Sequence, residues 1–351
     1  MFFKKNPYTL SFGRKPPEFI ERYELKNRVI TTFTMPPITD TLFLITGVRG
    51  SGKTVLMSSI ASELEKDSSW IVLRINPHHD ILQAIYDELY AAIVQLHLSF
   101  SAEINLGIFK AEMNHNSLPE YSVFNLKSLL EAVSQKEMKV LITIDEVINT
   151  PQMVEFAHQF QVYTMENLPI FFLGTGLYEN IADLQNEKTL TFLYRAPKIF
   201  TTPLDISAMA SSYQSVFQIP THKALKLAQL TKGYAFAFQA LGYVYFEHQD
   251  AQTLDEILPI YDQILRESSY EKLWSELSDM DRLVCKAIAD SPDDLVKTIR
   301  QQINISSQKF SVYRNRLKEK GLIDTSRFGK VSFILPRFKE FIILQYELDA
   351  L

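Results

Sequence analysis

The chain has 351 residues, of which 46% are apolar, and a formal net charge of −5. This length can supply two or three domains with cores of their own, and the single cysteine, Cys285, excludes an internal disulfide framework. No stretch approaches the roughly eighteen consecutive apolar residues of a membrane helix. These features predict a cytoplasmic globular protein without a membrane partner. The mild acidity argues against general nucleic-acid binding, although a whole-chain sum can conceal a local basic region.

The first strong pattern in the chain is "LFLITGVRGSGKTVLM", from Leu42 to Met57. Its first five residues predict a buried strand, and Thr54 to Glu65 predict an amphipathic helix. The segment between them matches G-x-x-x-x-G-K-[ST], in which glycines let backbone N–H groups wrap a phosphate at the helix N-terminus. The sequence therefore predicts a nucleotide-binding loop formed by Gly47, Val48, Arg49, Gly50, Ser51, Gly52, Lys53, Thr54 and Val55.

A second pattern, "KVLITIDEV", supplies the acidic half of such a site. Val140 to Ile144 is a continuous apolar run suited to a central parallel strand, and parallel sheets bind ligands at the carboxyl ends of their strands. Lys53 is expected on the β- and γ-phosphates of ATP, with Thr54 and Asp145 holding Mg²⁺. Glu146 is then suited to polarise the attacking water.

Three further strands are predicted at Trp70 to Asn76, Pro169 to Gly176 and Lys198 to Leu204. Because the phosphate-loop strand and the Asp-Glu strand are far apart in sequence, another strand can lie between them with a polar group at its end. Thr175 fits that position, as a sensor of the γ-phosphate or as an ordinary strand-ending threonine. Between helical segments, Phe100 to Ser122 forms an insertion that is either a small hairpin or a loop.

The phosphate loop, the strand ending in Asp-Glu and the strand ending in Thr together resemble the AAA+ class of P-loop ATPases. The N-terminal "NPYTLSFGRKPPEFIERYEL" and the C-terminal "LKEKGLI…GKVSFILPRFKEFI" resemble the bacterial and archaeal ATPases related to origin-recognition-type and STAND-type proteins. This resemblance implies that the N-terminal arm helps to enclose adenine. The family's Gly-Arg-Glu element aligns with residues 21–24, although the glycine is missing here. The candidate adenine contacts are Arg22 and the arm from Pro7 to Arg14.

The resemblance also indicates where this chain departs from its relatives. AAA+ relatives carry a lid arginine that reads the γ-phosphate and STAND relatives carry Gly-x-Pro, whereas this chain has Gly233-Tyr234-Ala235. Lys232 is left as the candidate for coupling the lid to the phosphate. Arg195 resembles the arginine that such ATPases offer to their own or a neighbour's nucleotide, where a guanidinium can spread phosphoryl charge. The alternative for Arg195 is an ordinary surface ion pair.

After Leu204 the alternation of strands stops. Helical patterns predict a small lid, with helices at Asp205 to Phe217, His222 to Lys232, Ala235 to Gln249 and Thr253 to Ser268. Three shorter helices follow, at Asp281 to Ala289, Leu295 to Ile303 and Ser306 to Lys320. Two β runs, Leu322 to Asp324 and Lys330 to Leu335, complete the pattern of a winged helix.

This predicted winged helix concentrates positive charge. From Lys297 to Lys339 the basic residues are opposed only by Glu319 and Asp324. A basic recognition helix with a basic wing is the footprint expected for DNA. The candidate DNA-binding residues are Gln308, Lys309, Arg314, Arg316, Lys318, Arg327 and Lys330. In the resembling family the same module also serves as a protein contact or as a cover over the nucleotide.

These patterns predict a three-layer αβα P-loop core with a mostly parallel five-stranded sheet, followed by a helical lid and a winged helix. The expected domains are residues 1–204, 205–274 and 275–351. The expected activity is slow or partner-stimulated hydrolysis of ATP to ADP and phosphate, with Mg²⁺ as cofactor, in a switch whose winged helix engages DNA. The alternative is a STAND-like signalling ATPase that contacts a protein partner. A homo-oligomer fits either interpretation.

Overall fold

The computed structural model describes residues 5–11, 13, 15–96, 123–248 and 253–349. The predicted insertion at Phe100 to Ser122 lies outside these residues. By their internal contacts the residues form two compact units. The sheet unit consists of Arg22–Thr46 and Lys53–Phe200, and the C-terminal unit consists of Met1–Glu21, Gly47–Gly52 and Thr201–Leu351. No helix among the described residues is long and apolar enough to cross a membrane.

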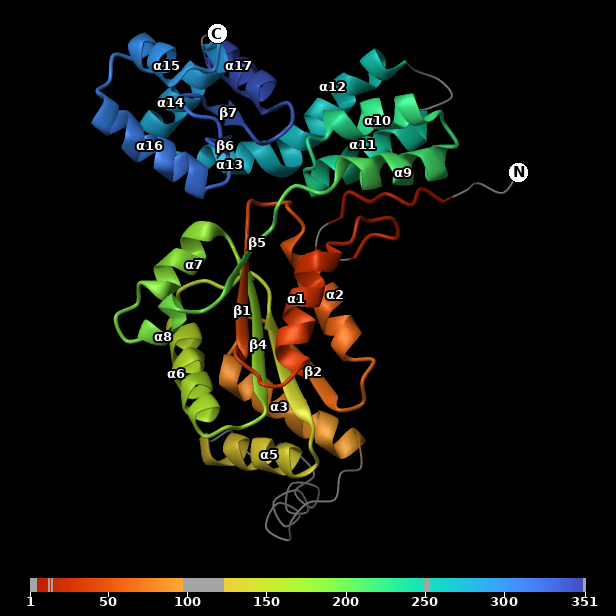
Figure 1. Ribbon diagram of the computed structural model, residues 1–351, viewed down its shortest axis with the longest axis vertical. Helices are drawn as coiled ribbons and strands as arrows, with labels where there is room; N and C mark the ends of the chain where they lie inside the picture. The colour runs from red at the N-terminus through yellow and green to blue at the C-terminus, as the bar shows by residue number, and fades with distance from the viewer. Residues whose placement is uncertain (1–4, 12, 14, 97–122, 249–252, 350–351) are drawn as a thin grey trace. The chain divides into compact units, whose positions relative to one another are not determined.

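The sheet unit is built on five parallel strands in the order β2-β3-β4-β1-β5 (Figure 1). Their bounds are β1 Leu42–Thr46, β2 Trp70–Ile75, β3 Lys139–Ile144, β4 Ile170–Gly176 and β5 Lys198–Phe200. The prediction of a five-stranded, mostly parallel sheet is confirmed. The predicted strand between β1 and β3 is also confirmed, and it is β4. The last strand is shorter than predicted, because only Lys198 to Phe200 pair with β1.

The register of the strands places their carboxyl ends at one edge of the sheet. Gly174 of β4 pairs with Ile144, the last residue of β3, and with Leu44 of β1. Asp145 therefore follows β3 at the level where β4 reaches Thr175. The phosphate loop leaves β1 at the same edge, since Thr46 pairs with the last residue of β4.

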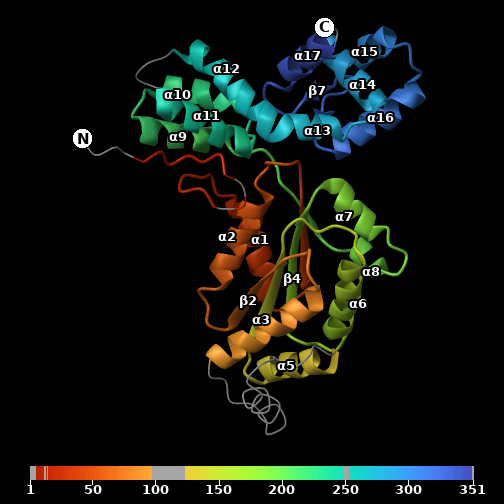
Figure 2. The same ribbon diagram turned by 180° about the vertical axis from the view of Figure 1, so that it is seen from behind.

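Helices cover both faces of this sheet, which makes three layers (Figures 1 and 2). One face is covered by α1 Tyr23–Thr34 and α2 Lys53–Leu64, and the other by α3 Ile81–Gln95, α5 Val123–Gln135, α6 Pro151–Met165, α7 Tyr178–Gln185 and α8 Thr191–Tyr194. Alternate residues of each strand enter opposite faces: Phe43 packs with α1 and α2, and Leu44 packs with the other layer. This alternation explains why the strands are apolar throughout.

The C-terminal unit begins with four helices, α9 Ile206–Phe217, α10 Thr221–Leu230, α11 Ala235–His248 and α12 Leu254–Leu265. The N-terminal arm packs against them through Tyr8, whose ring lies 5.7 Å from Tyr213 and 5.5 Å from Phe238 between centroids. Gly242 permits this approach, because a Cβ there would lie 2.6 Å from the Tyr8 ring. The sequence indicated this lid but not its union with the arm.

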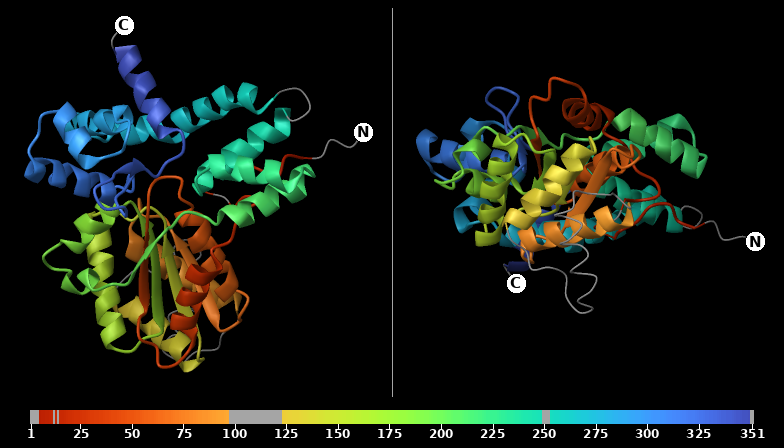
Figure 3. Two further views of the ribbon diagram at one scale, coloured as in Figure 1. Left: turned by 45° about the horizontal axis from the view of Figure 1, so that its top comes forward. Right: turned by 90° about the horizontal axis from the view of Figure 1, so that it is seen from below.

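The rest of the unit follows directly from α12. A π-helix, η1 Arg266–Tyr270, runs into α13 Glu271–Ser275, and then come α14 Asp279–Asp290, α15 Val296–Gln302, α16 Ser307–Glu319, β6 Ile323–Asp324, β7 Ser332–Phe333 and α17 Phe338–Asp349 (Figure 3). The antiparallel pair β6 and β7, with an added bridge between Leu295 and Lys330, gives the element order of a winged helix. The strands are shorter than predicted, because Asp324 accepts the Ser326 N–H and turns the chain.

Candidate nucleotide site

Four of the predicted site residues, Thr54, Asp145, Glu146 and Thr175, lie together at the carboxyl edge of the sheet. The Thr54 hydroxyl lies 2.8 Å from Asp145 Oδ2 and 3.0 Å from Oδ1, and donates to that carboxylate. Thr175 also donates its hydroxyl to Asp145 Oδ1. The Glu146 N–H in turn donates to Thr175 Oγ1 at 3.2 Å. The first turn of α2 and the ends of β3 and β4 thus contribute to one hydrogen-bonded cluster.

The two acidic residues of the cluster have different surroundings. Asp145 is half-buried and accepts from two hydroxyls, whereas Glu146 is exposed. Glu146 also has φ +58°, a left-handed conformation that is uncommon for a residue with a side chain and that tends to occur at functional sites. A hydrogen bond of 2.7 Å from the Val147 N–H to the Thr175 carbonyl closes the turn. The Asp145 carboxylate is thus hydrogen-bonded within the protein, whereas the Glu146 carboxylate is open to solvent.

The oxygen atoms of this cluster fit a magnesium ion. Mg²⁺ prefers hard oxygen ligands, and it usually keeps several waters while binding one or two carboxylates and the substrate phosphates. Thr54 and Asp145 offer a hydroxyl and a carboxylate that already converge. In the part of the chain that the structure describes, no group of three or more His, Cys, Asp or Glu side chains could hold a metal alone. A bound Mg²⁺ would therefore depend on phosphate and water for its remaining ligands.

The loop Gly47–Gly52 belongs by its contacts to the C-terminal unit. A Cβ on Gly47 would lie 1.9 Å from Thr201 Oγ1, so no larger residue fits there. The Ser51 hydroxyl lies 2.7 Å from the same Thr201 oxygen. The turn itself is closed by the Ser51 N–H to the Val48 carbonyl, with Gly50 at φ +72°. These contacts require glycine at Gly47, which the motif specifies, and favour it at Gly50, where the motif allows any residue.

Within the C-terminal unit, residues at the start of α11 donate hydrogen bonds to two carbonyl oxygens of the loop Gly47–Gly52. The Tyr234 hydroxyl donates to the Arg49 carbonyl at 2.6 Å, and the Phe236 N–H donates to the Gly50 carbonyl at 3.0 Å. The second bond satisfies one of the N–H groups that a helix N-terminus leaves without an intrahelical partner. Phosphate binding needs the N–H groups of such a loop, so both contacts use the opposite side of its peptide units.

The sequence reasoning placed the lid coupling on Lys232, and the structure gives that lysine another partner. Lys232 Nζ donates to the Phe333 carbonyl of β7 at 3.2 Å, and burial lowers its pKa. Tyr234, two residues further on, is the lid side chain that reaches the loop. The sequence offered no signal for this, because Tyr234 is one of 16 tyrosines and matches no lid motif.

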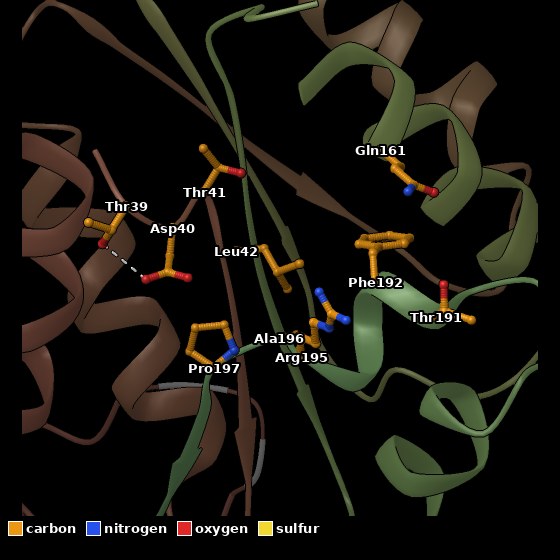
Figure 4. Close-up of a pocket in the computed structure, with 10 residues that line it drawn as sticks. All are labelled: Thr39, Asp40, Thr41, Leu42, Gln161, Thr191, Phe192, Arg195, Ala196 and Pro197. Atoms are coloured by element: carbon orange, nitrogen blue, oxygen red, sulfur yellow. Dashed lines mark hydrogen bonds between the residues drawn. The ribbon is translucent and has the colours of Figure 1, made fainter. Parts of the chain in front are cut away.

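Arg195 lies away from the Asp145 cluster. It precedes β5, which runs parallel to β1, and it lines a pocket of about 500 Å³ beside Leu42, the first residue of β1 (Figure 4). This is the amino edge of the sheet, opposite to the carboxyl edge that holds Asp145. Thr39 and Asp40, which share a hydrogen bond of 3.0 Å, form the facing wall. Arg195 is exposed at this edge, and its role toward a nucleotide stays a prediction.

Arg22, the predicted adenine contact, immediately precedes α1 in the sheet unit. Its carbonyl accepts the Lys26 N–H at 2.9 Å, and burial lowers the pKa of its guanidinium to about 10. Lys26 in turn binds Glu63 of α2 at 2.9 Å, which fixes α1 against the helix that follows the phosphate loop. The adenine contact itself stays a prediction.

The predicted DNA-binding residues divide into two groups. Those with exposed side chains and no ion pair in the described residues are Gln308, Lys309 and Lys318 on α16, and Arg327 and Lys330 in the turn between β6 and β7. Arg314 is half-buried. Arg316 binds Asp281 at 3.2 Å, where the carboxylate side chain is only 2% exposed. Arg316 thus supports the packing of α14 on α16 in addition to any outward role.

The parallel sheet, with helices on both of its faces, gives this chain a fold similar to that of solved origin-recognition proteins. A family model described as "Domain of unknown function (DUF8462)" matches residues 267–342, which run from η1 into α17. No curated protein matches the sequence.

Solved structures with this organisation cover nearly the whole chain. The ORC2 protein of Aeropyrum pernix in its ADP form is 13% identical, with 97% of each chain covered and a TM-score of 0.53. Cdc6p of Pyrobaculum aerophilum is 15% identical, with 96% of this chain and 97% of that chain covered and a TM-score of 0.49. The ORC1 protein of Aeropyrum pernix in complex with DNA is 15% identical, with 95% of each chain covered and a TM-score of 0.46. At these identities the likeness concerns the fold.

Proposed function

We propose that this protein binds and hydrolyses ATP as a molecular switch, and that its winged helix engages DNA. The observation that carries the proposal is the cluster of Thr54, Asp145 and Thr175, because a hydroxyl after a phosphate loop meets a carboxylate after a parallel strand. Such a pair is the arrangement that P-loop NTPases use for Mg²⁺ and phosphate. The Aeropyrum pernix ORC2 protein, whose fold is similar, was solved in an ADP form.

Each predicted residue of the nucleotide site has a chemical role in this proposal. Lys53 and the backbone N–H groups of the loop bind the β- and γ-phosphates. Thr54 and Asp145 hold Mg²⁺, which neutralises the charge that develops on the phosphoryl oxygens. Glu146 accepts a proton from the attacking water, and its exposure leaves it open to that water. Thr175 fixes the Asp145 carboxylate and the Glu146 backbone in place.

The proposal is tested by measuring ATP binding and phosphate release with matched variants. Lys53→Ala should abolish ATP binding, whereas Lys66→Ala, just after the other end of α2 and 70% exposed, should leave it unchanged. Glu146→Gln should bind ATP but release phosphate slowly, with a loss of about 100- to 10,000-fold typical of a removed general base. ATP-induced stabilisation that survives in Lys53→Ala would refute the site.

Support for DNA comes from the exposed cations of α16 and of the wing turn. The turn from Arg327 to Lys330 is closed by a backbone hydrogen bond of 3.1 Å and bridged to Leu295, so the backbone that carries its two cations is fixed. Between them stands Phe328, whose side chain is fully exposed, with a relative accessibility of 104%. An aromatic side chain between cations suits the charged and apolar surfaces of a DNA groove.

A gel-shift series in rising salt tests the DNA proposal. Combined Lys309→Ala and Lys318→Ala should weaken duplex binding and reduce its salt dependence by about two released counterions. A control pair, Lys127→Ala with Lys188→Ala in the sheet unit, should change neither. If the unaltered protein does not bind duplex DNA even at low salt, the DNA role is lost while the ATPase proposal stands.

One contact favours the alternative in which the winged helix acts on the nucleotide loop itself. Gly321, which follows α16, lies so close to Val48 that a Cβ on it would be 2.5 Å from Val48 Cγ1. A signalling ATPase could use this contact as a cover and release it toward a protein partner. Arg195 would then serve the nucleotide of a second copy. Assembly size and ATP turnover, measured with and without duplex DNA, separate the two functions.

A further inference from the structure

A chain of hydrogen bonds leaves the phosphate loop through the lid. The Tyr234 hydroxyl, which donates to the Arg49 carbonyl, also lies 2.9 Å from the Ser269 hydroxyl. Tyr234 and Ser269 are 5% and 1% exposed, so the chain is shielded from water. A buried hydrogen bond in a low-dielectric interior is stronger and more directional than an exposed one. The loop is therefore tied, through one tyrosine, to the segment that contains Ser269.

That segment is the π-helix η1, Arg266–Tyr270. Tyr270, the residue that follows Ser269, contacts the winged helix. Tyr270 donates its hydroxyl to the Pro336 carbonyl. Its ring lies 5.0 Å from that of Phe338 and 5.6 Å from that of Phe341, measured between centroids. Ser269 and Tyr270 are adjacent, so one short element holds the lid tyrosine at one residue and the start of α17 at the next.

A π-helix is suited to act as a switch. Its backbone hydrogen bonds span one residue more than those of the flanking α-helix, it is rare, and it recurs at functional sites. Conversion of η1 to α-helix shifts the register by one residue and rotates its side chains by about 100°. Because Ser269 and Tyr270 are consecutive, they cannot change register independently. The same shift that breaks the Tyr234 contact therefore also moves Tyr270 against Pro336.

We propose that Tyr234, Ser269 and the π-helix η1 form a relay that couples the nucleotide state of the phosphate loop to the winged helix. This inference rests on the proposed ATP site and adds the means of its regulation. A phosphate held by the Gly50 N–H polarises the peptide unit whose carbonyl, that of Arg49, accepts from Tyr234, and hydrogen bonds in series strengthen one another. Nucleotide binding therefore strengthens the grip of Tyr234 and favours the π register. Tyr234 is a positioning residue, since it holds the loop by a carbonyl.

The phenols of the relay remain donors over the ordinary range of pH. Burial raises the pKa of Tyr234 and, together with neighbouring phenols, the pKa of Tyr270. Both hydroxyls stay protonated through neutral and mildly alkaline solution. The relay thus responds to the loop and not to pH.

The test is hydrogen–deuterium exchange on the full chain with ADP and with a non-hydrolysable ATP analogue. In the unaltered protein the ATP analogue should slow exchange in residues 266–275 and 332–341. Tyr234→Phe should lose most of this protection and bind the analogue about three- to tenfold more weakly, as expected for one hydrogen bond. Ser269→Ala should lose the protection at 332–341 while keeping analogue affinity within about twofold, because the Arg49 contact is left intact.

Tyr213→Phe is the matched control. Tyr213 is also a buried lid tyrosine whose hydroxyl donates to a carbonyl, that of Phe238 at 2.8 Å, and it does not contact the phosphate loop. It should retain both affinity and protection. Equal protection in Tyr234→Phe and in the unaltered protein overturns the relay, as does nucleotide binding that leaves exchange in 266–275 and 332–341 unchanged. Absence of nucleotide binding in the unaltered protein overturns the proposed function instead, and the relay with it.

Discussion

The carboxyl edge of the sheet and the buried tyrosines of the C-terminal unit both join side chains from distant parts of the chain. At the sheet edge, Thr54 and Thr175 meet Asp145 because parallel strands end together. In the C-terminal unit, Tyr234 meets Ser269 because of how α11 packs against α12 and η1. The first meeting follows from strand pattern and motif spacing, whereas the second depends on tertiary packing. A motif therefore locates chemistry well, and it says little about what the chemistry is connected to.

Among the variants that compare sheet edge, loop and C-terminal unit, the largest effect is expected from a change at Gly47 in the loop. Gly47→Ala would place a methyl group 1.9 Å from Thr201 Oγ1, so the loop must move. Loss of two hydrogen bonds to a charged phosphate corresponds to about 3 kcal/mol, or about a hundredfold in ATP affinity by titration calorimetry. Gly329→Ala is the control for an added methyl group outside the loop, because no atom lies within 4 Å of the Cβ position of Gly329. Normal ATP affinity in Gly47→Ala would contradict the loop geometry.

A second variant tests whether the sheet-edge cluster acts in chemistry. Thr175→Val removes the donor to Asp145 and the acceptor of the Glu146 N–H, and we expect phosphate release to slow by about ten- to a hundredfold, the cost of two mispositioned groups. Thr143→Val is matched, since Thr143 is also buried in the sheet and donates to the Leu73 carbonyl. If both variants slow turnover equally, the effect belongs to the packing of the sheet.

A third prediction concerns a residue that the sequence assigned to DNA. Arg316→Ala leaves the carboxylate of Asp281 buried without its cation, which should lower the free energy of unfolding by about 1–3 kcal/mol. Urea denaturation measures this change. Lys318→Ala, an exposed position on the same helix, should stay within about 0.5 kcal/mol. Equal stability of the two variants would show that the ion pair of Arg316 with Asp281 does not stabilise the fold.

The smallest effects distinguish two tyrosines that are equally buried. Tyr270→Phe removes a hydroxyl that donates to the Pro336 carbonyl and should cost about 0.5–1.5 kcal/mol. Tyr261 is fully buried on α12, and its hydroxyl has no hydrogen-bond partner among the described residues. Tyr261→Phe should therefore be neutral or slightly stabilising. A destabilised Tyr261→Phe in thermal denaturation would show that this hydroxyl does have a partner.

Much of the sheet unit could be predicted from the sequence. Leu42–Thr46 has the bounds that the apolar run indicated, and the strand that ends near Thr175 lies between β1 and β3 as expected. These features follow from local rules, because buried parallel strands are apolar throughout and their ends share one edge. The meeting of Thr175 with Asp145 required only the order of the strands. The sequence could not decide whether Thr175 acts on the γ-phosphate.

The features that were missed depend on contacts between segments far apart in the chain. The π-helix η1 reads as ordinary helix, because five residues are too few to reveal a shift in the apolar period. Arg316 reads as an exposed cation, since nothing near it in sequence shows that Asp281 is buried beneath it. Lys232 is the lid residue that the sequence indicates, whereas the structure brings Tyr234 to the loop. Tertiary packing decided each case, and a single sequence contains no direct record of it.

Cys285, the single cysteine, is a natural probe of how often the C-terminal unit unfolds locally. It lies on α14 with no exposed surface, and burial raises the pKa of its thiol, so the folded protein should resist thiol-labelling reagents. Labelling must then wait for the surrounding helices to separate. Because no second cysteine competes for reagent, the rate of modification by a maleimide would report how often this half of the molecule comes apart.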